Sequence, residues 1–283
     1  MLGEPRHMHI PTVEPFPAPL AAVPWRDDHY DADRGEIMIN LTERRARRAA
    51  LALLDPELLD WTAPADRGPL RIAARYLPAA HPGQIGGDVY DVAWHGDEAL
   101  MLVADVRGKG QRAARYAAAI LGAFRSYPNA ASADPLAVAA SLDNAVSAMG
   151  GPEDFATAVL VTVDGSGQIV VVSCGHPPPL VVTDGVARPA LTAPALPLGL
   201  GSAPIAIRQD FPRDSRLVLY TDGLSEARNP IGEYFPLLDQ GPLFDSYHLE
   251  VALDALVGRV VSHVRGMPDD DLTVLVAEEA LSV

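Results

Sequence analysis

Four short aspartate-bearing segments constrain the fold and the chemistry more than any other feature of this sequence. They read Gly-Gly-Asp at residues 86–88, Ala-Asp-Val-Arg-Gly-Lys-Gly at 104–110, Tyr-Thr-Asp-Gly at 220–223 and Asp-Asp-Asp-Leu-Thr at 269–273. Each lies at a glycine turn or at the end of an apolar run, where a carboxylate stays accessible to solvent and a ligand can approach the backbone. A fold that brings the four segments together would form a site for a hard cation.

The acidity of the chain restricts its partners. The 283 residues carry a formal net charge of −15, whereas proteins that bind nucleic acid usually present a basic face. We therefore expect no nucleic-acid partner. The same charge would repel a phosphorylated substrate, so a site that handles phosphate would need bound cations to reverse the local field.

The cysteine and hydropathy patterns predict a cytoplasmic protein. The single cysteine, Cys174, excludes an intrachain disulfide, and nothing suggests an oxidising compartment. The N-terminus lacks the pattern of a signal peptide, and no window reaches the roughly 20 apolar residues of a membrane span. We therefore expect no membrane contact.

Composition divides the chain into three parts. Residues 1–40 are rich in proline and lack a core-forming pattern, which is typical of a flexible arm. Residues 41–68 form a linker region, in which Thr42 can cap a helix over 42–53. Residues 69–283 carry the strand-like and helical patterns of one catalytic-size domain.

The segment before the domain leaves a regulatory role open. The helix over 42–53 could pack against the domain and change the order of the site, or it could mediate a homodimer. Its arginine-rich pattern is more typical of a solvated linker helix.

Within the domain, short apolar runs bounded by turn residues predict strands, and longer runs with a period near 3.6 residues predict helices. The predicted strands are 71–77, 89–94, 98–104, 155–163, 168–173, 180–183, 216–220 and 272–277, and the predicted helices are 111–125, 135–148 and 249–264. Many strands joined by tight turns favour an α+β fold of mostly antiparallel sheets flanked by helices.

The four segments supply only oxygen ligands, with no histidine or cysteine at metal-binding spacing nearby. Such a set favours Mg²⁺ or Mn²⁺ over a structural zinc site. Two such ions, roughly 3.5–4 Å apart, can activate a bridging water and clamp phosphoryl oxygens, which is the chemistry of phosphate-ester hydrolysis. Taken singly, each aspartate also fits a turn or a cap, because Asp-Gly is a common turn signal.

Two further residues are weighed for a chemical role. His176 is followed by three prolines, and this pattern favours a buried or turn-stabilising histidine over a catalytic one. Cys174 lacks the downstream arginine that a cysteine-dependent phosphatase needs, so we expect a small core residue.

The order of the motifs resembles that of the metal-dependent protein phosphatase (PPM, type 2C) family. The matching series is Gly-Gly-Asp-x-Tyr-Asp from residue 86, Asp-Val-x-Gly-Lys-Gly from 105, Thr-Asp-Gly-Leu-x-Glu from 221 and Asp-Asp-x-Thr from 270. Two further segments, Cys-Gly-His-Pro-Pro at 174–178 and Leu-Pro-Leu-Gly at 196–199, are similar to the bacterial branch typified by the stage II sporulation E phosphatase. The resemblance extends over about residues 70–276.

The resemblance implies a four-layer α-β-β-α sandwich, in which two mostly antiparallel sheets are flanked by helix pairs and two Mn²⁺ or Mg²⁺ ions lie at one end. It implies a hydrolase that dephosphorylates phosphoserine or phosphothreonine with a water activated by the two metals. In this branch the substrate is commonly a phosphorylated anti-sigma factor antagonist. The rival interpretation is a catalytically inactive regulatory binding module of the same fold, although retention of all four motifs favours the enzyme.

The resemblance also implies a set of metal ligands. Carried over motif by motif, they are Asp88, Asp105, the carbonyl of Val106, Asp222 and Asp270. Asp105 would bridge the two metals, Asp222 and Asp270 would complete one of them, and Asp88 would ligate directly or through water. Asp105, Asp222 and Asp270 are accordingly the expected catalytic residues. Asp271 replaces Asp270 if the last motif is shifted by one position.

The sequence departs from the eukaryotic members of this family beside the second motif. Arg107 stands where those members have a histidine that is a candidate general acid, and Lys109 follows two residues later. Either side chain could contact phosphate, or either could lie in a solvent-facing turn. No counterpart of the phosphate-binding arginine of those members is evident, so the substrate phosphate could rest on the metals alone.

Overall fold

The computed structural model describes residues 70–79, 86–95, 98–126, 134–151, 153–245 and 248–279. The expected flexible arm over 1–40 and the linker region over 41–68 lie outside the described residues, and so does the helix expected over 42–53. Their predicted roles therefore stay predictions.

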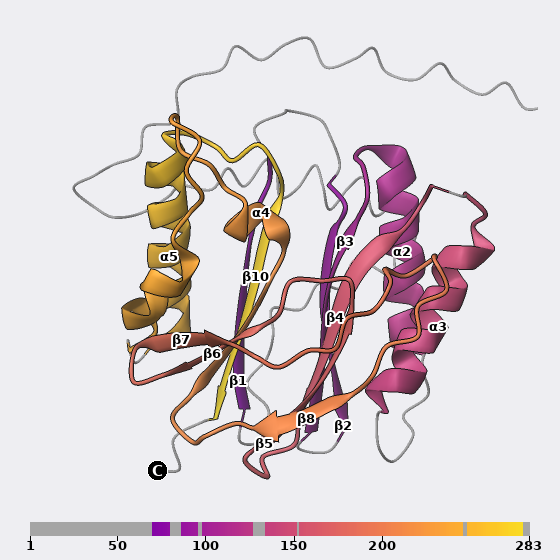
Figure 1. The fold of residues 1–283 in the computed structure, drawn as a ribbon, viewed down its shortest axis with the longest axis horizontal. Coiled ribbons are helices and arrows are strands. Elements are labelled where there is room, and N and C mark those ends of the chain that lie inside the picture. The colour runs from indigo at the N-terminus through magenta and orange to yellow at the C-terminus, as the bar shows by residue number, and fades with distance from the viewer. Residues whose placement is uncertain are drawn as a thin grey trace, which may run out of the picture.

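Two five-stranded sheets form the centre of the domain (Figure 1). The first sheet has the order β1 (Leu70–Leu77), β10 (Leu272–Glu279), β9 (Arg216–Tyr220), β6 (Leu180–Thr183) and β7 (Val186–Pro189). The second has the order β2 (Asp88–His95), β3 (Glu98–Val106), β4 (Ala156–Val163), β5 (Gln168–Cys174) and β8 (Ile207–Asp210). Neighbouring strands are antiparallel throughout both sheets. The expectation of mostly antiparallel sheets is confirmed.

Strand β3 shows why these sheets have continuous apolar strands instead of an alternating pattern. Met101 and Val103 pack in the core between the two sheets, whereas Leu100, Leu102 and Ala104 pack in the core under the helices. Successive side chains of a strand point to opposite faces, so a strand covered on both faces must be apolar at every position.

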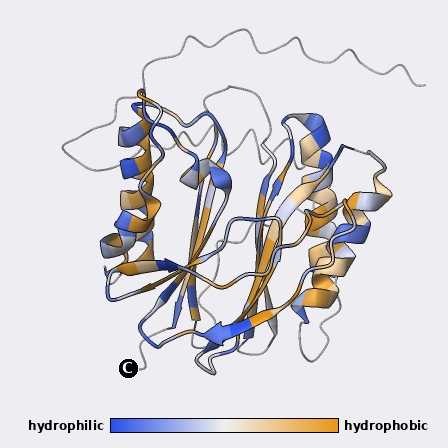
Figure 2. Ribbon diagram, in the orientation of Figure 1, coloured by the Kyte–Doolittle hydropathy of each residue, from blue (hydrophilic) through white to orange (hydrophobic). Residues whose placement is uncertain are grey.

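Helices complete the outer layers. Helices α2 (Gln111–Ser126) and α3 (Pro135–Ala148) cover the second sheet, and α5 (Leu249–Val264) covers the first together with the 3-10 segment η2 (Leu237–Asp245). The helices turn apolar residues to the sheets and polar residues outward (Figure 2). The four-layer α-β-β-α sandwich is therefore confirmed, with one member of the outer layer on the first sheet being a 3-10 segment. In the part of the chain that the structure describes, no helix is long and apolar enough to cross a membrane.

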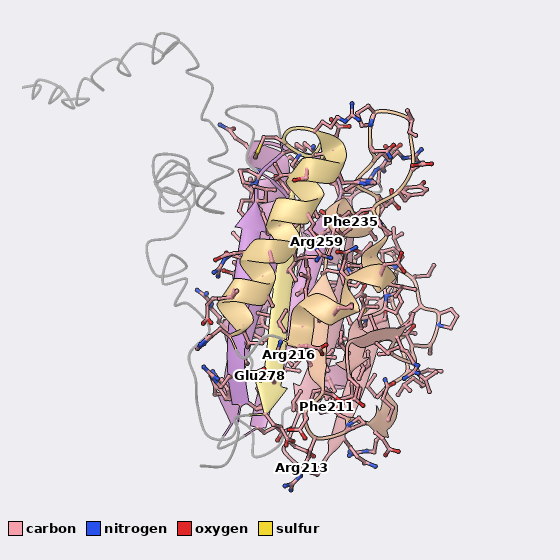
Figure 3. The ribbon with its side chains drawn as sticks, turned by 90° about the vertical axis from the view of Figure 1, so that its left-hand side faces the viewer. Phe211, Arg213, Arg216, Phe235, Arg259 and Glu278 are labelled. Carbon is pink, nitrogen blue, oxygen red and sulfur yellow. The ribbon has the colours of Figure 1, made fainter. Side chains whose placement is uncertain are left out.

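One end of the first sheet is held by a largely buried ion pair. The Arg216 guanidinium, in β9, donates from Nε to Glu278 Oε2 on β10 at 2.6 Å, and it also donates to the carbonyl of Phe244 in η2 (Figure 3). Because β9 starts at Arg216 and ends beside the Asp222 motif, this pair fixes the end of the sheet that lies away from the aspartates.

Candidate metal centre

The antiparallel pairing brings the ends of four strands to the same end of the sandwich. In the second sheet Asp88, the first residue of β2, lies opposite Asp105 near the end of β3. In the first sheet Tyr220, the last residue of β9, pairs with Val274 near the start of β10. The helix α4 (Asp222–Ser225) begins directly after β9. All four sequence segments lie at one end, where the hydroxyls of Thr221 and Thr273 from the first sheet reach Asp88 of the second. The condition that the sequence analysis set for a cation site, that one fold brings the four segments together, is met.

Asp88 lies deeper than its glycine turn predicts, because it is only 3% exposed. Its Oδ2 accepts hydrogen bonds from the hydroxyls of Thr221 at 2.8 Å and Thr273 at 2.7 Å. Burial, followed by the negative charge of Asp105, raises the pKa of Asp88 well above its usual value. The expectation of an accessible carboxylate at this turn is thus wrong for Asp88, since residues of the opposite sheet cover it.

The two threonines are functional candidates that sequence reasoning missed, although both lie inside the aspartate motifs. Besides binding Asp88, Thr221 Oγ1 accepts a hydrogen bond from the amide of Thr273 at 2.9 Å, and the amide of Thr221 donates to the carbonyl of Thr273 at 3.1 Å. These bonds join β9 to β10 and both of them to β2 of the other sheet. The signal to look for would have been a threonine within a few residues of a candidate metal-binding aspartate, directly before Asp222 in the case of Thr221 and three residues after Asp270 in the case of Thr273.

The negative charges of Asp105, Asp222 and Asp270 interact with one another. Burial raises the pKa of Asp105 to about 7, with further contributions from the charges of Asp222 and Asp270. The pKa of Asp222 is also raised, first by burial and then by the charge of Asp270. The negative charge of the neighbouring carboxylates therefore destabilises the ionised forms of Asp105 and Asp222, which is the situation that a bound cation relieves.

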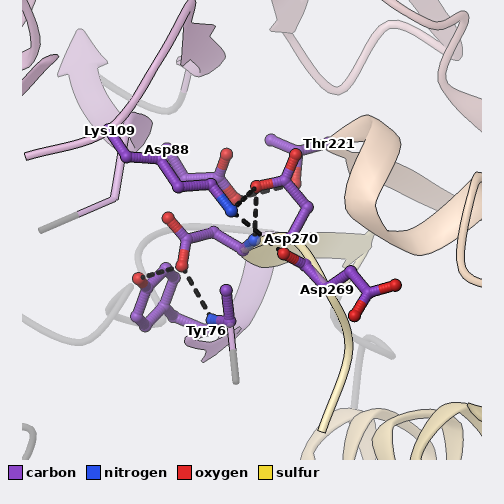
Figure 4. Close-up of polar contacts among 8 residues, drawn as sticks. Tyr76, Asp88, Lys109, Thr221, Asp269 and Asp270 are labelled. Atoms are coloured by element: carbon purple, nitrogen blue, oxygen red, sulfur yellow. Dashed lines mark hydrogen bonds and ion pairs between the residues drawn. The ribbon is translucent and has the colours of Figure 1, made fainter. Parts of the chain in front are cut away.

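The structure gives Asp270 and Asp271 different surroundings (Figure 4). Asp271 is 5% exposed, and its Oδ1 accepts hydrogen bonds from the hydroxyl of Tyr76 and the amide of Ala79, both at 2.9 Å. The side chain of Asp270 is 56% exposed. Asp271 therefore ties β10 to the end of β1, while Asp270 remains accessible at the surface of the cluster.

The two glycines before Asp88 allow a close approach of chain segments. A Cβ on Gly86 would lie 1.4 Å from Oδ2 of Asp271, and a Cβ on Gly87 would lie 2.3 Å from the carbonyl oxygen of Val106. A side chain at either position would displace its neighbour. The carbonyl of Val106 is therefore held next to Asp105, on the side toward Gly87.

Lys109 and Arg107, the two basic residues after Asp105, have different partners. Lys109 Nζ lies 2.9 Å from Asp270 Oδ1 and donates to the carbonyl of Asp269 at 3.0 Å (Figure 4). Arg107 donates to the carbonyl of Glu153 at 2.8 Å, and its guanidinium lies over the ring of Phe155. Only Lys109 of this pair contacts the 269–271 segment in the described structure.

His176 and Cys174 are buried, as the sequence predicts. The carbonyl oxygen of Tyr220 lies 3.0 Å from Nε2 of His176, and the hydroxyl of Thr157 lies 2.8 Å from Nδ1. A carbonyl only accepts, so Nε2 carries the proton and Nδ1 accepts from Thr157, which is the arrangement of a neutral ring. Burial lowers the pKa of His176 to about 4. This histidine joins β9 to the second sheet.

The donor set fits hard cations in its chemistry. It consists of carboxylate and carbonyl oxygens, which Mg²⁺ and Mn²⁺ prefer, and burial together with neighbouring carboxylates raises the pKa of Asp105 and of Asp222. Among the described residues, no three acidic, histidine or cysteine side chains already converge closely enough to hold an ion. The carboxylates would have to turn toward one another to bind one.

Comparison with known families assigns the chain. The family model described as Stage II sporulation protein E (SpoIIE) matches residues 95–279, which is more than half of the sequence. The chain belongs to this family of PP2C-type phosphatases.

Solved structures show the same fold. The chain is similar to the SiaA-PP2C domain of Pseudomonas aeruginosa, with 22% identity, a TM-score of 0.69, and coverage of 85% of this chain and 98% of that one. It is similar to the RsbU and RsbW domains of Rv1364c from Mycobacterium tuberculosis, with 27% identity, a TM-score of 0.63 and coverage of 76% of this chain. It spans only 61% of that protein's chain. It is also similar to RsbX in complex with magnesium, with 19% identity, a TM-score of 0.60, and coverage of 76% and 98%.

Proposed function

We propose that this chain is a metal-dependent phosphoserine and phosphothreonine protein phosphatase that uses two Mn²⁺ or Mg²⁺ ions. The observation that carries the proposal is that Asp105, Asp222 and Asp270, from three separate motifs, lie at one end of the sandwich, where the charges of Asp222 and Asp270 act on Asp105. The buried Asp88 lies opposite Asp105 in the same sheet. Membership of a PP2C-type phosphatase family supports the same reaction class.

The proposed ligands follow the sequence prediction. Asp105 would be shared by both ions, and Asp88, the Val106 carbonyl, Asp222 and Asp270 would contribute the other protein ligands. When bound, the two ions would lower the pKa of a water toward neutrality and bind the phosphoryl oxygens. The accessible position of Asp270 favours it over Asp271, whose carboxylate is already engaged by β1.

The protein's own residues hold Asp88 in position and give this end of the sandwich a negative charge. Thr221 and Thr273 fix Asp88 from the opposite sheet, so this carboxylate is held in place before any ligand arrives. The clustered negative charge concentrates divalent cations at the end of the sandwich. Bound cations would in turn make the site attractive to a phosphoryl group, which an acidic protein otherwise repels.

We further propose that the substrate is a phosphorylated anti-sigma factor antagonist, which would place the protein in the cytoplasm. The support is its family, which belongs to sigma-factor signalling, and the similarity to a chain with RsbU and RsbW domains. Dimerisation through residues 41–68 stays a prediction.

The test is hydrolysis of p-nitrophenyl phosphate by the purified full chain in EDTA, Mg²⁺ and Mn²⁺. We expect turnover that requires a metal and is lost in Asp105→Asn. The matched control is Asp254→Asn, because Asp254 is an exposed aspartate of α5 that pairs with Arg75, away from the site. If Asp105→Asn turned over substrate as fast as Asp254→Asn, the assignment of Asp105 as a metal ligand would be refuted.

The alternative, a binding module without chemistry, makes a different prediction. Such a protein would bind Mn²⁺ but show no turnover with p-nitrophenyl phosphate or with a phosphorylated antagonist. Calorimetric titration of Mn²⁺ alongside the turnover assay therefore separates the two functions.

A further inference from the structure

Lys109 stands out by composition as well as by position. The sequence contains 22 basic residues, of which 21 are arginine and one, Lys109, is lysine. Arginine thus serves at every other basic position, including the ion pairs of Arg75, Arg125 and Arg216. The one lysine contacts the candidate metal centre.

The local backbone directs this lysine at the 269–271 segment. Lys109 lies between the end of β3 and the start of α2, flanked by Gly108 and Gly110, whose φ angles are 92° and 82°. Residues with a Cβ rarely adopt such angles. The loop is therefore shaped by its glycines, and the lysine side chain spans 160 positions of sequence to reach Asp269.

Lys109 holds both the backbone and the side chain of its target. Its Nζ contacts the carbonyl of Asp269 and Oδ1 of Asp270. The amide of Asp271 donates to the same Oδ1 at 3.0 Å. In the described part of the chain, both contacts of the Asp270 carboxylate thus fall on one oxygen, which leaves Oδ2 for another ligand.

We propose that Lys109 is a positioning residue that holds Asp270 in the orientation required for metal binding. The inference rests on the proposed function, because it assigns Lys109 a role toward a ligand of that centre. Asp270 is exposed, lies between two other aspartates and is repelled by Asp105 and Asp222. Without Lys109 its carboxylate would turn toward solvent and away from the cluster.

An ammonium group suits this position better than a guanidinium. Lysine presents a compact charge whose donors point in tetrahedral directions, so one nitrogen can serve a carbonyl and a carboxylate that lie on different sides of it. The guanidinium of arginine is planar and favours two parallel bonds to one carboxylate. That geometry would engage both oxygens of Asp270 and block Oδ2.

Positioning and simple charge neutralisation predict opposite results for Lys109→Met. If Lys109 were only a counter-ion, its removal would make the cluster more negative and Mn²⁺ would bind more tightly. If Lys109 orients Asp270, its removal weakens binding, and the loss of a residue that holds a metal ligand typically costs about 10- to 100-fold in affinity.

The experiment is calorimetric titration of the metal-free full chain with Mn²⁺ alone. We expect Lys109→Met to bind Mn²⁺ about 10- to 100-fold more weakly than the wild type. In a protein that already carries Asp270→Asn, adding Lys109→Met should weaken binding by a smaller factor. Arg112→Met should bind Mn²⁺ with wild-type affinity. Arg112 is a matched control, because it is a nearby exposed cation that pairs with Asp154. Equal or tighter binding in Lys109→Met, or an equal loss in the Asp270→Asn background, overturns the proposal.

A second measurement does not depend on metal binding or on the stability of a lysine variant. Because the chain has one lysine, ¹⁵N-lysine labelling gives a single side-chain ammonium resonance. We expect this resonance to shift in metal-free Asp270→Asn and to stay unchanged in Asp254→Asn; an unchanged resonance in both refutes the contact. Failure of the wild type to bind Mn²⁺ refutes the metal centre itself, whereas equal affinity of wild type and Lys109→Met refutes only the role of Lys109.

Discussion

Replacing Asp105 with asparagine should stabilise the metal-free protein at high pH while it abolishes the response to metal. In the folded protein burial and the neighbouring carboxylates raise the pKa of Asp105 from 3.8 to about 7. This pKa difference between the unfolded and the folded chain lowers the free energy of unfolding by about 4 kcal/mol at high pH, because each unit of pKa shift is worth about 1.4 kcal/mol. Burial of an amide offsets part of this by about 1–2 kcal/mol, which leaves a gain of about 2–3 kcal/mol for Asp105→Asn.

The direction with pH follows from the protonation states. Below pH 3.8 the carboxyl is protonated in both the folded and the unfolded chain, so its charge costs nothing. As the pH rises toward about 7, the unfolded chain loses this proton first and the folded state becomes relatively less stable. The advantage of Asp105→Asn should therefore be absent near pH 4 and complete at pH 8.

The assay is urea unfolding followed by circular dichroism, at pH 5 and pH 8, in EDTA and in Mn²⁺. At a Mn²⁺ concentration about 100 times its Kd, the wild type should gain about 2.7 kcal/mol, while Asp105→Asn should gain nothing. A variant that is no more stable than the wild type at pH 8 in EDTA would show that Asp105 does not carry an unfavourable buried charge, and the electrostatic account of the centre would fail.

Two further perturbations test the supports of the site. Since the folded pKa of His176 is lowered to about 4, the wild type should lose up to about 3 kcal/mol relative to His176→Asn as the pH falls from 6.5 to 4; melting curves over this range check it, and parallel curves contradict it. Gly86→Ala should lower the free energy of unfolding by about 1–3 kcal/mol, because its Cβ would displace the Asp271 carboxylate from Tyr76. Gly122→Ala in α2, where a Cβ meets nothing within 4 Å, should raise the free energy of unfolding by about 0.5–1 kcal/mol. Equal melting temperatures for the two glycine variants would contradict this reasoning.

Helices and strands with a clear local pattern of apolar residues could be predicted from the sequence. The helix Pro135–Ala148 was predicted with its observed bounds from the helical spacing of its apolar residues. In the structure Asp134 caps it and Pro135 lies in its first turn. The strands Val186–Pro189 and Ile207–Asp210 were not predicted. Both are four-residue edge strands whose residues are exposed or half-buried, so neither has the apolar run on which the prediction depends.

The sequence predicted the types of metal ligand in the site, but it did not predict the residues that hold these ligands in place. The sequence placed Asp88, Asp105 and Asp222 in motifs, and the antiparallel register brings these motifs together. It could not show that Thr221 and Thr273 cover Asp88, because these residues lie 133 and 185 positions away from it in the chain. Burial of this kind is set by sheet packing, which a local pattern does not encode.

The place of β10 in the first sheet has a consequence for synthesis of the protein. This strand, the last one described, lies between β1 and β9, and it follows directly the segment that contains Asp270. During translation, β1 leaves the ribosome about 200 residues before its partner, so it must wait with an unpaired edge. A nascent chain that has not yet exposed β10 accordingly lacks both the closed sheet and the last proposed ligand, and phosphatase activity should begin only when β10 has left the ribosome and paired with β1.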